Sequence, residues 1–233
     1  MKEEILEVFC GNAIKEPTAE LTKKFQEKTG CTVHFTYGTV GSLVEKLNAG
    51  QVADVIILTT ELAKKLAEEK RVIGDTIAEV GKTGVGIAAR KGSKIPDIST
   101  VEALRQALLV AKTIAYVDPA KGATSGIHFA NVLEKLGIAD DVKEKSILLS
   151  GGYVIEFVAE GKAELGVQQI TEILPVQGAT LVGPLPPELQ KITTYAASVV
   201  ATTATNTLAA DFVRFITCPE AEPIFNALGF GRY

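Results

Sequence analysis

The first seventy residues of the chain alternate between short apolar segments and amphipathic ones. The apolar segments have the length and β-branched content of strands, and each is followed by helical periodicity. The expected strands cover residues 5–10, 32–37 and 54–58, and the expected helices cover about 16–28, 41–49 and 60–69. Alternation of this kind folds into right-handed βαβ units around a parallel sheet. The sequence therefore predicts an α/β fold.

After Val72 the alternation changes. The glycine-rich segment 80–90 predicts one long strand, and residues 193–200 predict a second, whereas the proline-rich segment 181–189 predicts an irregular connection. Two long strands that connect two sequence regions indicate two lobes joined by a two-strand hinge, each lobe a mostly parallel sheet flanked by helices. The expected first lobe comprises residues 1–82 and 197–233, and the expected second lobe comprises residues 83–196.

Small and polar residues occupy several of the turns that lead from a strand into a helix. These turns carry Asn12 and Ala13, Thr39 and Val40, Thr59, and Thr124 and Ser125. The free N–H groups of a first helical turn attract negative charge, and ligands of open α/β sheets bind at the carboxyl ends of strands. Any one such residue is equally well explained as a helix cap. Their recurrence predicts one shared site for a small anion.

Composition and motifs argue against several other functions. The formal net charge is −4 with no basic face, which argues against nucleic acid as a partner. No apolar run reaches the roughly 20 residues that span a bilayer, so we expect no direct membrane insertion. His34 and His128 are the only histidines, and no CxxC spacing occurs, so we expect neither a metal nor a cofactor. We also expect a monomer.

The compartment stays open at this stage. The charged residues that open the chain lead directly into a strand, so the printed sequence has no signal peptide. Either the protein is cytoplasmic, or it acts in the periplasm or facing the outside after removal of a leader. Three cysteines, Cys10, Cys31 and Cys218, are expected to be free, because the first two fall at opposite ends of neighbouring parallel strands.

Three ionisable residues are candidates for proton transfer. His128 lies one turn into the helix that begins near Ser125, close to any anion held there, although a capping or solvated role explains it as well. Glu156 and Glu172 each lie shortly after an expected site turn. Most other carboxylates of the chain have the spacing of solvated helix faces.

The order of these motifs resembles that of the periplasmic molybdate-binding protein family, the solute receptors of ABC importers. The resemblance rests on VFCGNAIKEPTAELTKKFQEKTG, VHFTYGTVGSLVEKLNAGQVADVII, AYVDPAKGATSG, FVAEGKAELGV and AADFVRFITCPEAEPIFNALGF, which together span nearly the whole chain. It implies the two-lobed type II periplasmic-binding fold, with a small anion captured between the lobes and a membrane component of an ABC importer as a possible partner.

The family's oxyanion site is only partly present. Compared with the family pattern, Ala13 stands in place of a serine, Thr39 and Val40 stand in place of paired serines, and Gln168 and Gln169 stand in place of a late tyrosine. A desolvated tetrahedral oxyanion would lack several hydrogen bonds here, each worth about 1 to 3 kcal/mol. Asn12, Tyr153, Gln168 and Gln169 can both donate and accept, and Gly152 is a further candidate contact.

Two functions follow from this resemblance. The first is a binding protein that takes an organic carboxylate in preference to molybdate. The second is an enzyme, because part of this subgroup resembles periplasmic aconitate isomerases, which move a proton along a tricarboxylate. In that case His128 or Glu156 would be the base, and the helix start at Thr124 and Ser125 would stabilise the enolate.

Overall fold

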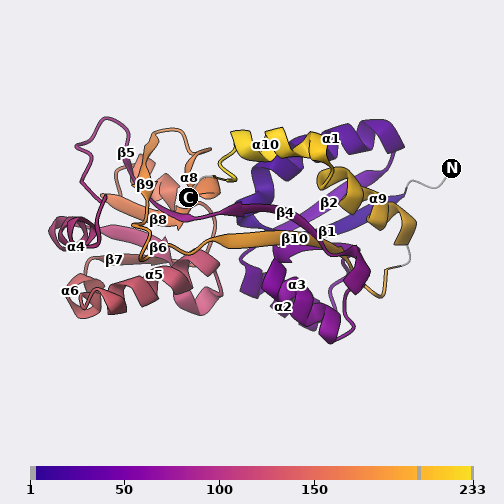
Figure 1. Cartoon of the computed structure of the whole chain (residues 1–233), viewed down its shortest axis with the longest axis horizontal. Coiled ribbons are helices and arrows are strands. Elements are labelled where there is room, and N and C mark those ends of the chain that lie inside the picture. Colours follow the sequence, from indigo (N-terminus) through magenta and orange to yellow (C-terminus); the bar gives the residue numbers. More distant parts are fainter. Residues whose placement is uncertain (1–3, 204–205, 232–233) are drawn as a thin grey trace. The chain divides into compact units, whose positions relative to one another are not determined.

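The structure, a computed structural model, describes residues 4–203 and 206–231 and divides into two compact units (Figure 1). Of the described residues, the first unit takes 4–82, 194–203 and 206–228. The second unit takes Thr83–Thr193 and residues 229–231. Each unit is built around a five-stranded sheet of its own, flanked by helices. The predicted α/β class is thereby confirmed.

The first unit has the strand order β2-β1-β3-β10-β4. Its elements are β1 (Ile5–Gly11), η1 (Asn12–Ile14), α1 (Lys15–Thr29), β2 (Thr32–Gly38), α2 (Val40–Asn48), β3 (Val55–Thr59), α3 (Thr60–Glu68), η2 (Gly74–Thr76), β4 (Ala78–Thr83), β10 (Thr193–Val199), α9 (Asn206–Ile216), η4 (Pro219–Ala221) and α10 (Glu222–Ala227). Strand β1 pairs in parallel with β2 and β3, and β10 runs antiparallel to β3.

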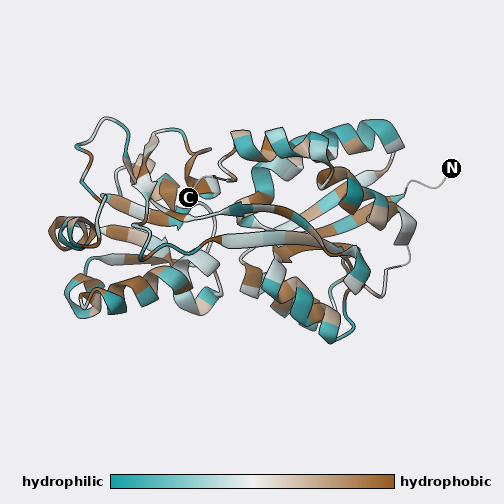
Figure 2. Ribbon diagram, in the orientation of Figure 1, coloured by the Kyte–Doolittle hydropathy of each residue, from teal (hydrophilic) through white to brown (hydrophobic). Residues whose placement is uncertain are grey.

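Burial explains why these segments form these elements. All five residues of β3 are buried, as the sequence pattern predicted for a central strand. Helix α1 turns Leu21 and Phe25 inward, and the ring of Phe25 meets Phe212 of α9 edge to face at a centroid distance of 5.1 Å. Figure 2 shows the hydrophilic residues that give α1 its opposite face. The helix ends at Gly30, whose φ of 73° lies in the left-handed region that favours glycine.

The second unit has the strand order β7-β6-β8-β5-β9. Its elements are β5 (Val85–Arg90), α4 (Val101–Val110), β6 (Ile114–Val117), η3 (Pro119–Lys121), α5 (Thr124–Lys135), α6 (Ala139–Lys143), β7 (Ser146–Leu149), α7 (Ile155–Ala159), β8 (Leu165–Gln169), α8 (Ile170–Ile173) and β9 (Ala179–Pro184). Strand β6 pairs in parallel with β7 and β8, whereas β5 pairs antiparallel with β8 and β9. Its core packs Phe129 and Leu133 of α5 against Ile87 and Val167 of the sheet.

Two local predictions were wrong. The segment 80–90 is not one long strand, because β4 ends at Thr83 in the first sheet and β5 begins at Val85 in the second. Part of the supposed irregular connection at 181–189 belongs to β9, which pairs with β5 from Gly86 to Arg90. Both errors have the same physical cause, since the hydrogen-bond partners that define these strands lie far away in sequence.

The three cysteines are free, and Cys10 and Cys31 are buried. Burial raises the pKa of the Cys10 thiol to about 12, and only a hydrogen bond with Thr18 opposes that shift. Because the thiolate is the reactive form, we expect iodoacetamide at pH 8 to modify the partly exposed Cys218 and to leave Cys10 unmodified in the native protein. Peptide mass mapping checks this expectation, and equal labelling of both residues before unfolding would contradict it.

Candidate anion-binding site

The register of the first sheet brings three predicted residues to one level. Gly11 pairs with Gly38, and Cys10 pairs with Ile57. Continuing these registers by one and by two residues places Asn12 level with Thr39 and with Thr59 at the carboxyl edge of the sheet. Each of them also stands where a strand passes into a helix. The sequence pattern therefore identified three turns that the fold of the first unit does bring together.

The side chains at these turns contribute unequally. The Oγ1 atom of Thr39 accepts a hydrogen bond from the Ser42 N–H at 3.1 Å, and that of Thr59 accepts one from the Leu62 N–H at 3.4 Å. Both hydroxyls thus act as helix caps, the alternative that the sequence left open. Ala13 and Val40 bring no polar side chain, so these two positions can offer a ligand only their backbone groups.

In the second unit, the turn from β6 into helix α5 carries the predicted residues Thr124 and Ser125. The helix begins at Thr124 after Ala123, whose side chain makes no capping hydrogen bond, and Ser125 is only 3% exposed. A Cβ atom on Gly126 would lie 2.2 Å from the carbonyl oxygen of Val117, so the first turn of the helix rests directly on the end of β6. Glycine suits this position because any side chain would collide with that carbonyl oxygen.

Two buried amides end strand β8. Gln168 is 0% exposed and Gln169 is 1% exposed. The Nε2 atom of Gln168 donates to the Gly152 carbonyl oxygen at 2.7 Å and to Oε1 of Glu172 at 2.9 Å, while Nε2 of Gln169 donates to Oγ1 of Thr193 at 3.2 Å. The Oε1 atoms of both glutamines are buried without a hydrogen-bond partner. The oxygen of Gln168 is therefore an unsatisfied acceptor, because its partner at Gly152 is a carbonyl that requires the NH₂ group. Gln169 faces a hydroxyl, which can pair with either end of the amide.

Glu172 is the third member of this cluster and is 6% exposed. Burial raises its pKa to about 8, and hydrogen bonds from the Gln169 backbone and the Gln168 side chain only partly offset that shift. The carboxyl group is consequently protonated and uncharged at pH 7. The sequence drew attention to Glu172 by its position after a site turn, but it carried no signal for this burial or for the partnership with Gln168.

The turn after β7 contributes Gly152 and Tyr153. Gly152 is exposed with φ of 76°, a left-handed conformation that suits glycine, and its carbonyl oxygen is held by Gln168 as described. Tyr153 is half-buried next to it. The structure therefore connects this turn to the end of β8 through one hydrogen bond between residues 16 positions apart.

The two expected bases lie in different surroundings. The Nε2 atom of His128 is 2.7 Å from the Leu189 carbonyl oxygen, so it carries the hydrogen, and partial burial lowers the pKa of the ring. Glu156 is exposed on α7. Among the described residues, no hydrogen bond joins either side chain to Thr124, Ser125 or Gln168. His128 is a neutral imidazole with one nitrogen already occupied.

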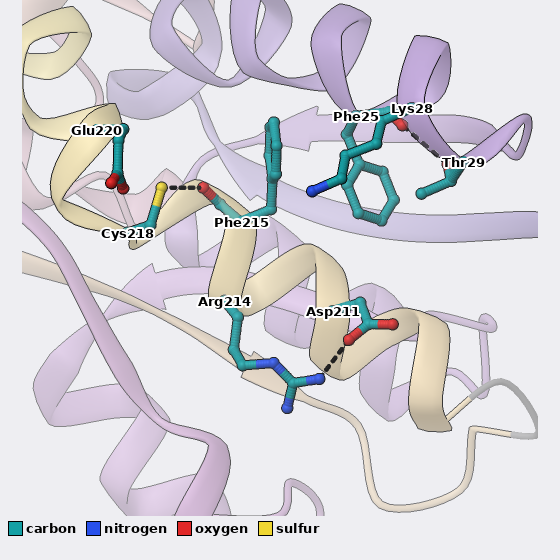
Figure 3. Close-up of a pocket in the computed structure, with 8 residues that line it drawn as sticks. All are labelled: Phe25, Lys28, Thr29, Asp211, Arg214, Phe215, Cys218 and Glu220. Carbon is teal, nitrogen blue, oxygen red and sulfur yellow. Dashed lines mark hydrogen bonds and ion pairs between the residues drawn. The ribbon is translucent and has the colours of Figure 1, made fainter.

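A pocket of about 610 Å³ in the first unit lies apart from all the predicted site residues (Figure 3). It is lined by Phe25, Lys28, Thr29, Asp211, Arg214, Phe215, Cys218 and Glu220. Its charged groups are partly engaged with their neighbours, since Arg214 pairs with Asp211 and the Nζ atom of Lys28 lies 5.9 Å from the centre of the Phe215 ring. Lys28 and Thr29 end α1, whereas the candidate site turns begin helices. The pocket is therefore a separate surface feature.

Within 4–203 and 206–231, no group of three or more histidine, cysteine, aspartate or glutamate side chains is arranged to hold a metal ion. Over the same residues, no helix combines the length and the apolar character needed to cross a bilayer.

Comparison with solved structures defines the fold class. The periplasmic molybdate-binding protein of Azotobacter vinelandii superimposes with a TM-score of 0.80 over 97% of this chain and 98% of its own, at 19% identity. The chain thus has the fold of the type II periplasmic binding proteins.

The chain belongs to the family described as bacterial extracellular solute-binding protein, whose model matches residues 6–231. Two curated relatives are each 27% identical to it. One is named aconitate isomerase, from a Pseudomonas species, and aligns over 84% of this chain and 75% of its own length. The other is named molybdate-binding protein ModA, from Rhodobacter capsulatus, and aligns over 97% of this chain and 88% of its own length.

Proposed function

We propose that this protein is the solute receptor of an ABC-type importer and that its ligand is a small organic carboxylate. One observation carries the proposal, namely the buried Gln168, whose carbonyl oxygen has no partner. Molybdate and its analogues offer a site mainly acceptor oxygens, which cannot satisfy a carbonyl oxygen. An organic acid can carry a carboxylate for the N–H groups at the start of α5 and other groups that donate to Gln168 or Gln169.

The first unit supports the same choice of ligand. At its carboxyl edge, Ala13 and Val40 bring no hydroxyl, which leaves Asn12, Thr39 and Thr59 as its side-chain donors. The cap bonds of the two threonines use only an acceptor lone pair and leave each O–H free to donate. A fully desolvated tetrahedral dianion needs many donors, and each unmet hydrogen bond costs about 1 to 3 kcal/mol. Under this proposal the candidate contacts of the first unit are Asn12, Thr39 and Thr59. The candidate contacts of the second unit are Thr124, Ser125, Gly152, Tyr153, Gln168 and Gln169.

The proposal includes a place and a partner. A receptor of this family would act in the periplasm or facing the outside and would deliver its ligand to the membrane component of an importer. It would work as a monomer without a cofactor.

The first test is a thermal-shift screen of the purified protein. The panel comprises molybdate, tungstate, sulfate, phosphate, citrate, the aconitates and shorter dicarboxylates. A ligand at 100 times its dissociation constant should add about 2.7 kcal/mol to the free energy of unfolding. Stabilisation by carboxylates alone supports the proposal, whereas stabilisation by molybdate and tungstate alone would overturn it.

The double substitution Thr124→Ala with Ser125→Ala should weaken binding of the ligand found in that screen by about 1 to 3 kcal/mol, because two hydroxyl donors at the start of α5 are lost. Isothermal titration calorimetry measures the affinity, and chemical denaturation checks that the fold persists. The exposed Thr100→Ala, which removes a cap from α4 in the same unit, is the matched control. Affinity equal to that of the control would show that the ligand does not contact this helix start.

The second candidate function is isomerisation of aconitate. It is favoured by the relative of that name and by a buried carboxyl group, Glu172, with a pKa of about 8, since general acids and bases work best near the pH of the reaction. Proton NMR of cis-aconitate with the protein distinguishes the two functions. Interconversion with trans-aconitate above the uncatalysed rate would establish the enzyme. Its loss in only one of Glu172→Gln, Glu156→Gln and His128→Asn would identify the base.

A further inference from the structure

The amide of Gln168 has a fixed orientation. A backbone carbonyl oxygen only accepts hydrogen bonds, so the group that faces the Gly152 oxygen at 2.7 Å must be the NH₂ group of the side chain. The same NH₂ group donates its second hydrogen to Glu172 at 2.9 Å. Both donors are therefore occupied, and the carbonyl oxygen Oε1 points away from these two partners.

That carbonyl oxygen is buried and has no hydrogen-bond partner. A buried acceptor left unpaired is destabilising, and most buried polar atoms in native proteins are paired with protein or water. The amide lies at the end of β8, where Gln168 is level with Val117, on which the first turn of α5 rests. This unpaired acceptor therefore lies in the interior, at the level of the sheet where α5 begins.

Among the groups that an organic acid can carry, a hydroxyl suits this acceptor, for two reasons. A carboxylate that is ionised at neutral pH has no hydrogen to give to Oε1. An ammonium group has hydrogens, but a buried cation is costly unless it is paired, and the Gln168 oxygen is an uncharged acceptor. A hydroxyl donates one hydrogen bond without bringing a charge.

We propose that Gln168 is a specificity-determining residue whose Oε1 accepts a hydrogen bond from a hydroxyl of the ligand, so that the ligand is a hydroxy-carboxylic acid. Glu172 is the positioning residue, because it holds the second N–H of the Gln168 amide. This inference rests on the proposed function, that of a carboxylate receptor.

Two pairs of probes that differ by one hydroxyl test the inference. They are citrate with tricarballylate, and malate with succinate. Calorimetry on the intact protein should give an affinity for the hydroxy acid that exceeds that for its partner by about tenfold in at least one pair. Equal affinities within both pairs overturn the inference while the proposed function stands. If none of the four acids binds, the inference fails, and the thermal-shift screen with its wider panel decides the proposed function separately.

Substitutions then connect the selectivity to the two residues. Gln168→Met removes the acceptor at similar volume and should bring the affinity ratio close to one. Glu172→Met should lower the ratio as well, and Glu172→Gln, which keeps an acceptor for the Gln168 N–H, should restore it. Glu160→Gln, at an exposed position after α7, is the control and should leave the ratio unchanged. A full ratio in folded Gln168→Met would refute the role of Oε1, and a full ratio in Glu172→Met would refute the positioning role. Should a variant fail to fold, the ratio of the natural protein decides alone.

Discussion

Replacing Glu172 by glutamine should abolish a fall in stability that the natural protein shows between about pH 4.5 and pH 8. The ordinary pKa of a glutamate is 4.5, and burial raises that of Glu172 to about 8 in the folded protein. Below pH 4.5 the carboxyl is protonated in both states. As the pH rises further, the unfolded chain ionises first, so the unfolded state is favoured progressively until the folded protein also ionises near pH 8.

The expected size of this effect is large. Each unit of pKa difference corresponds to about 1.4 kcal/mol, so the loss over the whole interval is on the order of 3 to 5 kcal/mol. Urea denaturation at half-unit steps from pH 4.5 to 9 measures the free energy of unfolding of both proteins. Glu172→Gln should show a flatter profile and should be the more stable protein at pH 8. Its matched control is Glu160→Gln, which should keep the natural slope, and identical slopes in all three proteins would disprove the burial of an uncharged Glu172.

Replacing Gly126 by alanine should destabilise the second unit and weaken ligand binding together. The added Cβ atom would lie 2.2 Å from the Val117 carbonyl oxygen and 3.0 Å from its carbonyl carbon, closer than real Cβ atoms approach. The Val117 atoms in this contact belong to the backbone, so the clash can be relieved only if α5 moves away from β6. Overpacking of this kind costs about 1 to 3 kcal/mol and sometimes more, although alanine is intrinsically the better helix former.

Urea denaturation and calorimetry measure the two consequences of Gly126→Ala. Under the proposed function, displacement of the first turn of α5 moves the N–H groups that hold the anion, so the affinity should fall even where the protein is fully folded. Gly74→Ala is the matched control, because its Cβ would meet only Ala67 at an ordinary 3.7 Å. If Gly126→Ala were as stable as that control, the contact between α5 and β6 would be looser than the structure shows.

The predicted site residues differ in whether neighbouring residues in the sequence are enough to identify them. Asn12, Thr39 and Thr59 were found because each ends an apolar strand and opens a helix, a pattern contained in about five consecutive residues. Gln168 and Glu172 are different. That Gln168 holds the Gly152 carbonyl, and that a glutamate is buried uncharged beside it, depends on the packing of α8 against β5, β8 and β9. Their role in binding stays a prediction until the ligand experiments are done.

The sequence by itself determined the α/β class, the order of most strands and helices, the turns between them and the family to which the chain belongs. Those properties follow from the period of apolar residues and from the small or capping residues at element ends, which act over one or two helical turns. Only the tertiary structure decided that the chain leaves one sheet at Thr83 and enters the next at Val85, that residues 179–184 form a strand, and that Gln168 has an unpaired acceptor. The reason is that hydrogen-bond partners and burial at these positions are supplied by segments distant in the sequence, and a local pattern carries no information about them.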